Sequence, residues 1–329
     1  MSALAPTMQA FFTERMLAQR RASANTVASY RDTFRILLGF AQRRTGKAPS
    51  KLQLEDLDAT LIGAFLEHLE AERHNSVQTR NTRLAAVHSL FAYAALRHPE
   101  QAELIQRVLA IPNKRTDRQL VSFLTRAEID ALLAAPDRDT WIGRRDRVLL
   151  LVAVQTGLRV SELTALTCAD VELGIGAHVR CHGKGRKERI TPLTSQAVAL
   201  LRVWLAERRG HPADPLFPSR RGGALSRDAV ELLVARHTRT AEQHCPSLAT
   251  KTVSPHVLRH SCAMQLLAAG VDTSVIALWL GHEGVETTQI YLHADLAIKE
   301  RALARTAPAG TAAGRYRPPD ALLAFLESL

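Results

Sequence analysis

Cysteine is scarce in this chain of 329 residues, and its four cysteines, Cys168, Cys181, Cys245 and Cys262, form no Cys-x-x-Cys pair. This spacing argues against a disulfide framework and is typical of reduced thiols in a cytosolic protein. The sequence also lacks an apolar run long enough to span a bilayer, and its N-terminus lacks a basic segment followed by an apolar one. We therefore expect a cytoplasmic protein with no membrane partner.

Acidic residues are too few to balance the basic ones. Asp and Glu number 32 against 43 Lys and Arg, which gives a formal net charge of +11 and an isoelectric point near 10.1. Such a charge favours a polyanionic partner through attraction and counterion release, although scattered surface arginines alone would give the same balance. The chain is long for one core, so two domains are expected.

The first third of the chain places apolar residues at helical spacing. The predicted helices cover 27–41, 61–69, 77–96 and 104–109. Ser23-Ala-Asn25-Thr26 is a candidate cap for the first of them. The segment 113–119 then becomes polar and basic directly after a proline. We predict a helical domain over 1–112 and an interdomain linker over 113–122; the alternative interpretation of the linker is an ordinary surface loop.

The remainder of the chain combines helical spacing with one hairpin signature. Helices are predicted over 125–134, 145–154, 159–165, 195–208, 227–239, 255–269, 273–280 and 285–291. Alternating residues over 177–182 and 188–193 flank Gly183-Lys184-Gly185-Arg186, which predicts an antiparallel hairpin. The second domain, 123–305, is thus mostly helical with a small antiparallel sheet. Residues 306–329 form a tail whose short amphipathic C-terminal helix is expected to dock, in cis or in trans.

Arg159 has a sequence context suited to binding phosphate. It follows Thr156-Gly157-Leu158 at a predicted helix start, so the guanidinium fork and the helix N-terminus can both face an anion. Glu162 lies one helical turn later, where its carboxylate can hold Arg159 or a nearby histidine. The alternatives are a surface arginine in an ordinary turn and a surface glutamate.

His256 and Arg259 are spaced i, i+3, so both project from one face of the helix predicted there. An imidazole in this position suits proton transfer near neutral pH. His260 stands i, i+4 from His256, which is also the histidine spacing of zinc peptidase helices. Such a helix needs a glutamate where this chain has Val257, so we expect no metal.

Tyr291 is one of four tyrosines and follows these motifs closely. Tyr30 and Tyr93 lie on or near apolar stripes, and Tyr316 lies in the tail. A phenol, with an ordinary pKa of about 10, needs nearby positive charge and a base to act as a nucleophile. The arginines and histidines, with His282 in the Leu-Gly-His motif, supply both. The pattern indicates attack of a tyrosine on a phosphodiester.

With these motifs, residues 120–305 resemble the tyrosine recombinases, also called phage integrases. Residues 1–110 are similar to the helical DNA-clamping domain of that family, through Asn25-Thr26-Val-Ala-Ser-Tyr30 and Asn81-Thr82-Arg83-Leu84. The resemblance implies a mainly α fold: a helical DNA-clamping domain, and a mostly helical catalytic domain with a small antiparallel sheet. Around 291–303 the chain looks most like integrases carried by mobile elements.

The resemblance assigns a role to each candidate residue. The catalytic positions of the family are matched by Arg159, Lys184, His256, Arg259, His282 and Tyr291, with Glu162 as the acidic orienting residue. Lys184, at the predicted hairpin tip, matches the lysine that protonates the departing 5′ oxygen; Lys187 competes for that role and is otherwise a DNA contact. Phosphate contacts from the first domain are expected from Arg31, Arg35, Arg80 and Arg83, for which a solvated helix face is the alternative.

The implied activity is site-specific breakage and rejoining of double-stranded DNA through a 3′-phosphotyrosyl intermediate. It requires no metal, ATP or other cofactor, and it implies four protomers on paired DNA sites. Two alternatives remain open at this point. One is a type IB topoisomerase, with related chemistry but acting as a monomer. The other is a non-catalytic DNA-binding accessory protein on a recombinase scaffold.

Overall fold

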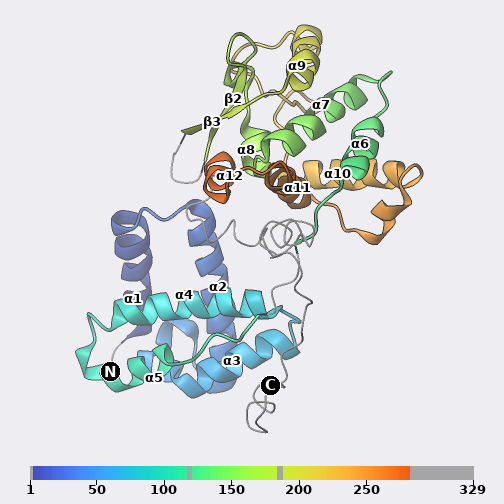
Figure 1. The fold of residues 1–329 in the computed structure, drawn as a ribbon. Helices are drawn as coiled ribbons and strands as arrows, with labels where there is room; N and C mark the ends of the chain where they lie inside the picture. The colour runs from blue at the N-terminus through green and yellow to red at the C-terminus, as the bar shows by residue number, and fades with distance from the viewer. Residues whose placement is uncertain (1–2, 117–120, 184–187, 282–329) are drawn as a thin grey trace, which may run out of the picture. The chain divides into compact units, whose positions relative to one another are not determined.

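The computed structural model describes residues 3–116, 121–183 and 188–281 (Figure 1). The chain divides into two compact units, Met1–Arg118 and Gln119–Leu329. Both are built mainly from helices, and the second also holds a small antiparallel sheet, so the expected fold class is confirmed. The predicted bounds of the linker and of the tail stay predictions, and the predicted helix over 285–291 lies outside the described residues.

The N-terminal unit is helical throughout its described part. Its elements are α1 (Leu4–Ala10), the π-helical segment η1 (Phe11–Gln19), α2 (Ala24–Thr45), the short turns η2 (Pro49–Lys51) and η3 (Leu54–Leu57), α3 (Ala59–Ala71), α4 (Val77–Ala94), η4 (Pro99–Gln101) and α5 (Ala102–Leu109). Ser23, Asp58 and Ser76 cap α2, α3 and α4, each accepting a hydrogen bond from the backbone N–H three residues ahead. The segment 4–19 was not predicted as helical.

Aromatic side chains from distant segments form much of the N-terminal core. Phe11 is fully buried and lies in contact with the rings of Tyr30, Phe34 and Tyr93. These four residues come from η1, α2 and α4, so the burial of one ring fixes the packing of three helical segments. The core continues through α3 and α5, and it is separate from the core of the C-terminal unit.

The C-terminal unit is built around one buried helix, α7 (Trp141–Thr156). Its elements are α6 (Arg126–Ala134), α7 (Trp141–Thr156), α8 (Val160–Ala165), η5 (Cys168–Asp170), β1 (Val171–Glu172), β2 (His178–His182), β3 (Glu188–Pro192), α9 (Ser195–Arg208), α10 (Arg227–Glu242), η7 (Pro246–Thr250), α11 (Pro255–Ala268) and α12 (Thr273–Leu280). Thr125 and Glu128 form the predicted capping box at the start of α6. Helix α11 packs against α7, and α12 packs against α11. This arrangement brings the end of α12 toward the turn that follows α7.

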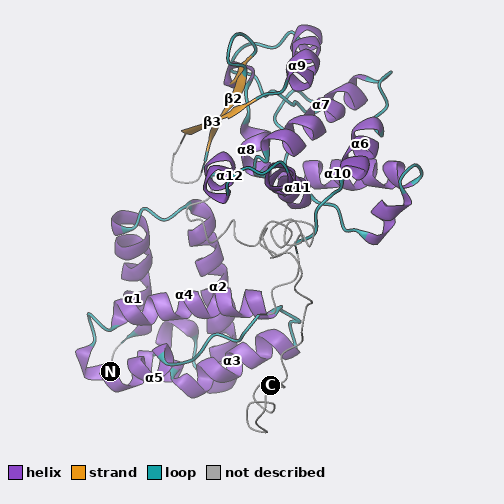
Figure 2. Cartoon of the chain, in the orientation of Figure 1, coloured by secondary structure: helices purple, strands orange, loops and turns teal. Residues whose placement is uncertain are grey.

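The sheet has the strand order β1-β2-β3 and is antiparallel throughout (Figure 2). Cys181 of β2 stands opposite Arg189 of β3, and Arg180 stands opposite Ile190. Strands β2 and β3 confirm the predicted hairpin, whereas β1 was not predicted. The inner face carries Val179 and Cys181 from β2, which are buried in the core of the unit.

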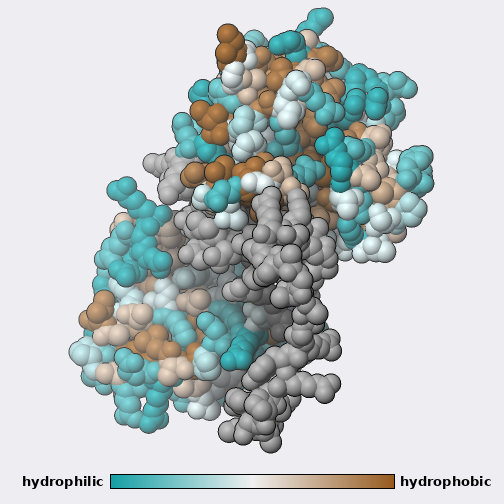
Figure 3. All heavy atoms as spheres, viewed as in Figure 1, coloured by the Kyte–Doolittle hydropathy of each residue, from teal (hydrophilic) through white to brown (hydrophobic). Residues whose placement is uncertain are grey.

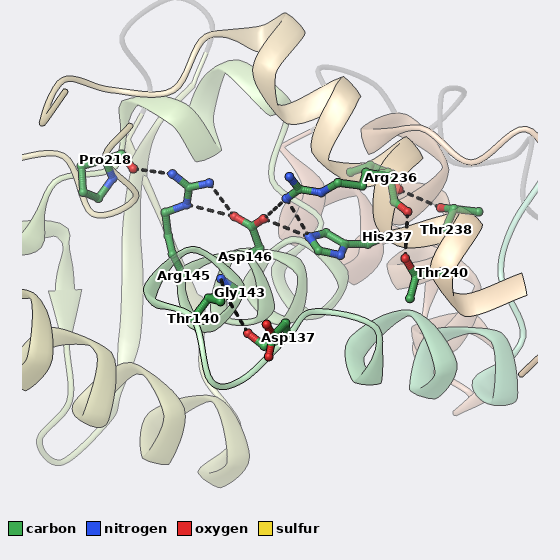
Figure 4. A network of polar contacts seen from close by, with 11 residues as sticks. Asp137, Thr140, Gly143, Arg145, Asp146, Pro218, Arg236, His237, Thr238 and Thr240 are labelled. Atoms are coloured by element: carbon green, nitrogen blue, oxygen red, sulfur yellow. Dashed lines mark hydrogen bonds and ion pairs between the residues drawn. The ribbon is translucent and has the colours of Figure 1, made fainter. Parts of the chain in front are cut away.

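A buried carboxylate anchors α7 to α10. Asp146 is completely buried and accepts hydrogen bonds from Arg145 (2.7 and 2.9 Å), Arg236 (2.5 Å) and His237 Nε2 (2.9 Å) (Figure 4). Arg145 also donates to the carbonyl oxygen of Pro218 at 2.7 Å. Because a buried charge must be paired, this network fixes the relative position of the two helices and the 218 loop.

The surface of the C-terminal unit is apolar in places. Val275 and Leu278 on α12 are exposed, and Figure 3 shows apolar atoms at the position of this helix. Within the described ranges, no helix combines the length and the apolar character that crossing a membrane requires.

Candidate active site

Arg159 lies at the junction of α7 and α8. Helix α7 ends at Gly157, which adopts a left-handed conformation with φ of 63°, and Leu158 is buried. Arg159 is the residue before the first turn of α8, as the sequence predicts, and its backbone N–H donates to Oε2 of Glu162 at 2.8 Å. The tight turn thus fixes the backbone from which the guanidinium projects.

Glu162 is the buried acceptor at the centre of this site. Its Oε1 accepts from Arg159 Nη1 at 2.8 Å and from Arg189 Nη1 at 2.9 Å, and its Oε2 also accepts from Arg189 Nη2 at 2.7 Å. Burial acts to raise the pKa of this carboxyl, but the hydrogen bonds from Arg189 and Arg159 and the charge of Arg189 lower it below the ordinary value. Glu162 is therefore ionised at neutral pH and holds Arg159.

Two arginines meet at the C-terminal end of α12. Arg259, only 3% exposed, donates from Nη1 to the Gly157 carbonyl oxygen at 2.6 Å and from Nη2 to the Leu280 carbonyl oxygen at 2.7 Å. Arg159 donates from Nη2 to the next carbonyl oxygen, that of Gly281, at 2.9 Å. These carbonyls belong to a helix end, where they have no partner within the helix. Both guanidinium groups are therefore held by the same short segment, Leu280–Gly281.

His256 lies in the first turn of α11, one turn before Arg259. Its pKa is lowered by partial desolvation and by the positive charges of Arg259, Arg159 and Arg227. The imidazole is therefore neutral at neutral pH and able to accept a proton. His260 lies against it, with ring centroids 4.6 Å apart in an edge-to-face arrangement. The two histidines thus belong to one cluster with the arginines.

Four predicted catalytic or DNA-contacting residues, Lys184, Lys187, His282 and Tyr291, lie outside the described residues. The segment that ends the described chain, Leu280–Gly281, is the one that Arg159 and Arg259 hold. His282 is the next residue along the chain. Within the described part of the chain there is no group of three or more His, Cys, Asp or Glu placed to hold a metal ion.

The arginines predicted to contact DNA in the N-terminal unit differ in their surroundings. Arg31 and Arg35 are exposed one turn apart on α2, and Arg83 on α4 is partly buried. Arg80 is buried, and its Nη1 donates to the carbonyl oxygen of Pro112 at 3.0 Å. The guanidinium of Arg80 thus holds the segment after α5, and its role as a phosphate contact stays a prediction.

Arg189 is a charged residue of the site that sequence reasoning missed. It lies on β3 and turns toward Glu162, while its neighbour Ile190 is 62% exposed. Strand alternation places residues 189 and 191 on one face and residue 190 on the other. The apolar side chain of Ile190 suggests the opposite orientation of the strand. The pairing of Arg189 with Cys181 across the two strands could have indicated its orientation, because paired residues lie on the same face of the sheet and Cys181 faces inward.

Known proteins resemble the chain over nearly its whole length. Residues 122–297 match the phage integrase family, and residues 10–98 match the phage integrase N-terminal SAM-like domain. The candidate integrase/recombinase y4rC of Sinorhizobium fredii is 57% identical over 328 residues, covering 100% of this chain and 99% of that protein. The tyrosine recombinase XerD of Pseudomonas putida is 34% identical, covering 91% and 96%.

A solved structure shows the same likeness in three dimensions. The XerH site-specific recombinase bound to a palindromic difH substrate, in a post-cleavage complex, has a TM-score of 0.70 and 25% identity. The match covers 87% of this chain and 81% of that one.

Proposed function

Since the chain belongs to the phage integrase family and is a site-specific tyrosine recombinase, we propose that it breaks and rejoins DNA strands through a 3′-phosphotyrosyl intermediate on Tyr291. The observation that carries the proposal is the convergence of Arg159 and Arg259. They come from different helices, yet they bond to the adjacent carbonyls of Gly281 and Leu280. Two guanidinium groups aligned in this way suit the non-bridging oxygens of one phosphate.

The proposed reaction starts with in-line attack of the Tyr291 oxygen on the scissile phosphorus. The phenol proton passes to His256, whose lowered pKa keeps it neutral and ready to accept. The bond from phosphorus to the 5′ oxygen breaks, and that oxygen takes a proton from Lys184. Arg159, Arg259 and His282 stabilise the added negative charge. These roles are the ones that the resemblance to the family implies.

Rejoining is the same reaction in reverse. The 3′ end stays linked to the tyrosine oxygen, so the phosphoester bond energy is retained. A 5′ hydroxyl group of another strand attacks the phosphotyrosine, and the proton transfers run backwards. This chemistry uses no metal, ATP or other cofactor. Recombination requires cuts on both strands of two duplexes, so we propose a tetramer on paired sites.

The partner is double-stranded DNA. In the N-terminal unit the exposed Arg31 and Arg35 on α2 and the partly buried Arg83 on α4 are the proposed phosphate contacts. Lys187, three residues after Lys184 in the sequence, is a further proposed contact. We propose that the protein acts in the cytoplasm and is encoded by a mobile element, whose ends would be its recombination sites.

The test is covalent trapping on nicked duplexes taken from the DNA that flanks the gene, including any inverted repeats. The wild-type chain should form a protein–DNA adduct, whereas Tyr291→Phe should bind the same DNA and form none. Tyr316→Phe is the matched control and should behave as wild type. An adduct in Tyr291→Phe, or a DNA-linked peptide that contains Tyr316, would overturn the assignment. Strand exchange between two labelled duplexes distinguishes a recombinase from a topoisomerase, and absence of any adduct would indicate an accessory protein.

A further inference from the structure

Arg189 makes a two-point contact with the site carboxylate. Its Nη1 and Nη2 donate to Oε1 and Oε2 of Glu162 at 2.9 and 2.7 Å, a fork-to-fork geometry that a lysine cannot reproduce. The side chains of Arg189 and Glu162 are 12% and 4% exposed. Such a pair is enclosed, so Arg189 cannot turn away from Glu162 without leaving a buried guanidinium group unpaired.

Arg159 shares both carboxylate oxygens with Arg189. Oε1 of Glu162 accepts from Arg159 Nη1 at 2.8 Å, and Oε2 accepts from the Arg159 backbone N–H at 2.8 Å. One negative charge is therefore divided between two guanidinium groups. If Arg189 were absent, the whole charge of Glu162 would face Arg159, and a phosphate would have to compete with it.

Arg189 also packs against the turn that Arg159 holds. A Cβ atom built on Gly281 would lie 2.6 Å from Arg189 Nη1, so the arginine occupies the space beside this glycine. Gly281 adopts a left-handed conformation with φ of 65°, and its carbonyl oxygen accepts from Arg159 Nη2 at 2.9 Å. Arg189 thus contacts the residues on both sides of the Arg159 guanidinium.

Arg189 also links β3 to α8 through its ion pair with Glu162. The strand begins at Glu188, directly after the segment that carries Lys184 and Lys187. A bidentate ion pair at the second residue of β3 fixes the base of that hairpin arm to α8. The same contact therefore positions the start of β3, the first part of the chain that the structure describes after that segment.

We propose that Arg189 is a positioning residue for strand cleavage: through Glu162 it sets the direction of Arg159 and keeps the Arg159 charge available to the scissile phosphate. This proposal rests on the proposed function. Arg189 itself does not contact the reacting atoms. Its effect is on the orientation and the effective charge of an arginine that does.

The test measures the rate of adduct formation on the nicked duplex under single-turnover conditions, from alkaline to mildly acidic pH. Arg189→Gln should slow cleavage by about 10- to 100-fold, the range seen in metal sites when a residue that orients a metal-binding side chain is lost. Arg189→Lys should recover part of the rate, since it keeps the charge but loses the fork. Arg180→Gln is the control, because Arg180 is exposed on the neighbouring strand, and it should match wild type.

The pH profile separates positioning from mere support of the fold. Without Arg189 the largest of the contacts that lower the pKa of the Glu162 carboxyl is lost, so Glu162 takes up a proton at a higher pH than in wild type. A protonated Glu162 no longer holds Arg159 in position, so in Arg189→Gln the rate should begin to fall at a higher pH. A variant that is only less stable, measured well below its melting temperature, should keep the wild-type dependence of the rate on pH. If Arg189→Gln does not fold, Arg189→Lys is compared in the wild-type and Glu162→Gln backgrounds. Its effect should disappear in the second, because Arg189 acts through that carboxylate.

Each outcome decides between the two claims. Arg189 variants that cleave at the wild-type rate, or that are slowed without a shift of the profile, overturn the positioning role and leave the proposed function intact. A slowing of Arg189→Lys that persists in the Glu162→Gln background also overturns it. A wild-type chain that forms no adduct overturns both, since the role of Arg189 depends on the reaction.

Discussion

Replacement of Gly157 by alanine tests whether the turn after α7 and the end of α12 are packed as closely as the structure shows. Gly157 has φ of 63°, and a Cβ atom there would lie 2.5 Å from Leu280 Cδ2 and 3.2 Å from Cys262 Sγ. Gly270, in the same unit, has φ of 84°, and a Cβ atom there would meet nothing within 4 Å. The two substitutions therefore share the backbone strain and differ in the contact.

The expected magnitudes follow from these two components. A left-handed conformation costs an L-residue about 1–2 kcal/mol, and this applies to both glycines. Overpacking a filled space adds about 1–3 kcal/mol, and this applies to Gly157 alone. The loss of unfolded-state freedom on changing glycine to alanine is common to both and cancels in the comparison. Gly157→Ala should thus be less stable than Gly270→Ala by about 1–3 kcal/mol.

Urea unfolding followed by tryptophan fluorescence is suited to this measurement. The three tryptophans of the chain, Trp141, Trp204 and Trp279, all lie in the C-terminal unit, so the signal reports the unfolding of that unit. Gly157→Ala should also slow DNA cleavage, because the Gly157 carbonyl oxygen accepts from Arg259. Equal unfolding midpoints and slopes for Gly157→Ala and Gly270→Ala would show that the contact with Leu280 is not tight, and the reasoning would be refuted.

Two further predictions concern proton transfer and assembly. Because the pKa of His256 is lowered below the ordinary value of about 6.5, cleavage should stay constant as pH falls to that value and decline only below it, as the base becomes protonated; a wild-type decline that starts above it contradicts this role. Deletion of residues 316–329 should abolish cooperative binding to paired sites and leave binding to a single site and the tryptophan-monitored unfolding unchanged, if the tail helix docks in trans. Assembly of the truncated chain at the wild-type concentration, measured by gel shift, would contradict trans docking, and a lower unfolding midpoint would indicate docking in cis.

Most helices of the fold could be predicted because their signals are local. Ser23 and Thr125 are polar caps followed by apolar residues at helical spacing, and both cap a helix in the structure. The segment 4–19 could not be predicted in this way, since the burial of Phe11 depends on rings from residues far along the chain. Strand β1 has only two residues and depends on its pairing with β2, so its pattern is too short to be recognised.

The contacts within the candidate site could be predicted only where they join residues that are close in the sequence. Glu162 and Arg159 are three residues apart on one helix turn, and their pairing follows from that spacing. The bond from Arg259 to Gly157 joins residues that meet only after α11 has packed on α7. The bond from Arg80 to the Pro112 carbonyl oxygen likewise joins residues that are far apart in the sequence, so the burial of Arg80 could not be predicted from its place on α4.

The groups that accept hydrogen bonds from Arg159 and Arg259 affect how much positive charge the site retains. Backbone carbonyls at the end of α12 hold Arg159 and Arg259 by hydrogen bonds, and a helix C-terminus is favourable for cations without supplying a full negative charge. The carboxylate of Glu162 is shared between Arg159 and Arg189, so its negative charge is not directed at Arg159 alone. A phosphodiester carries one negative charge, and attack by a phenolate adds a second in the transition state. Guanidinium groups that are held largely by carbonyl oxygens keep positive charge available for that second negative charge, so we expect the site to stabilise the transition state more than the bound DNA, which is the condition for accelerating cleavage.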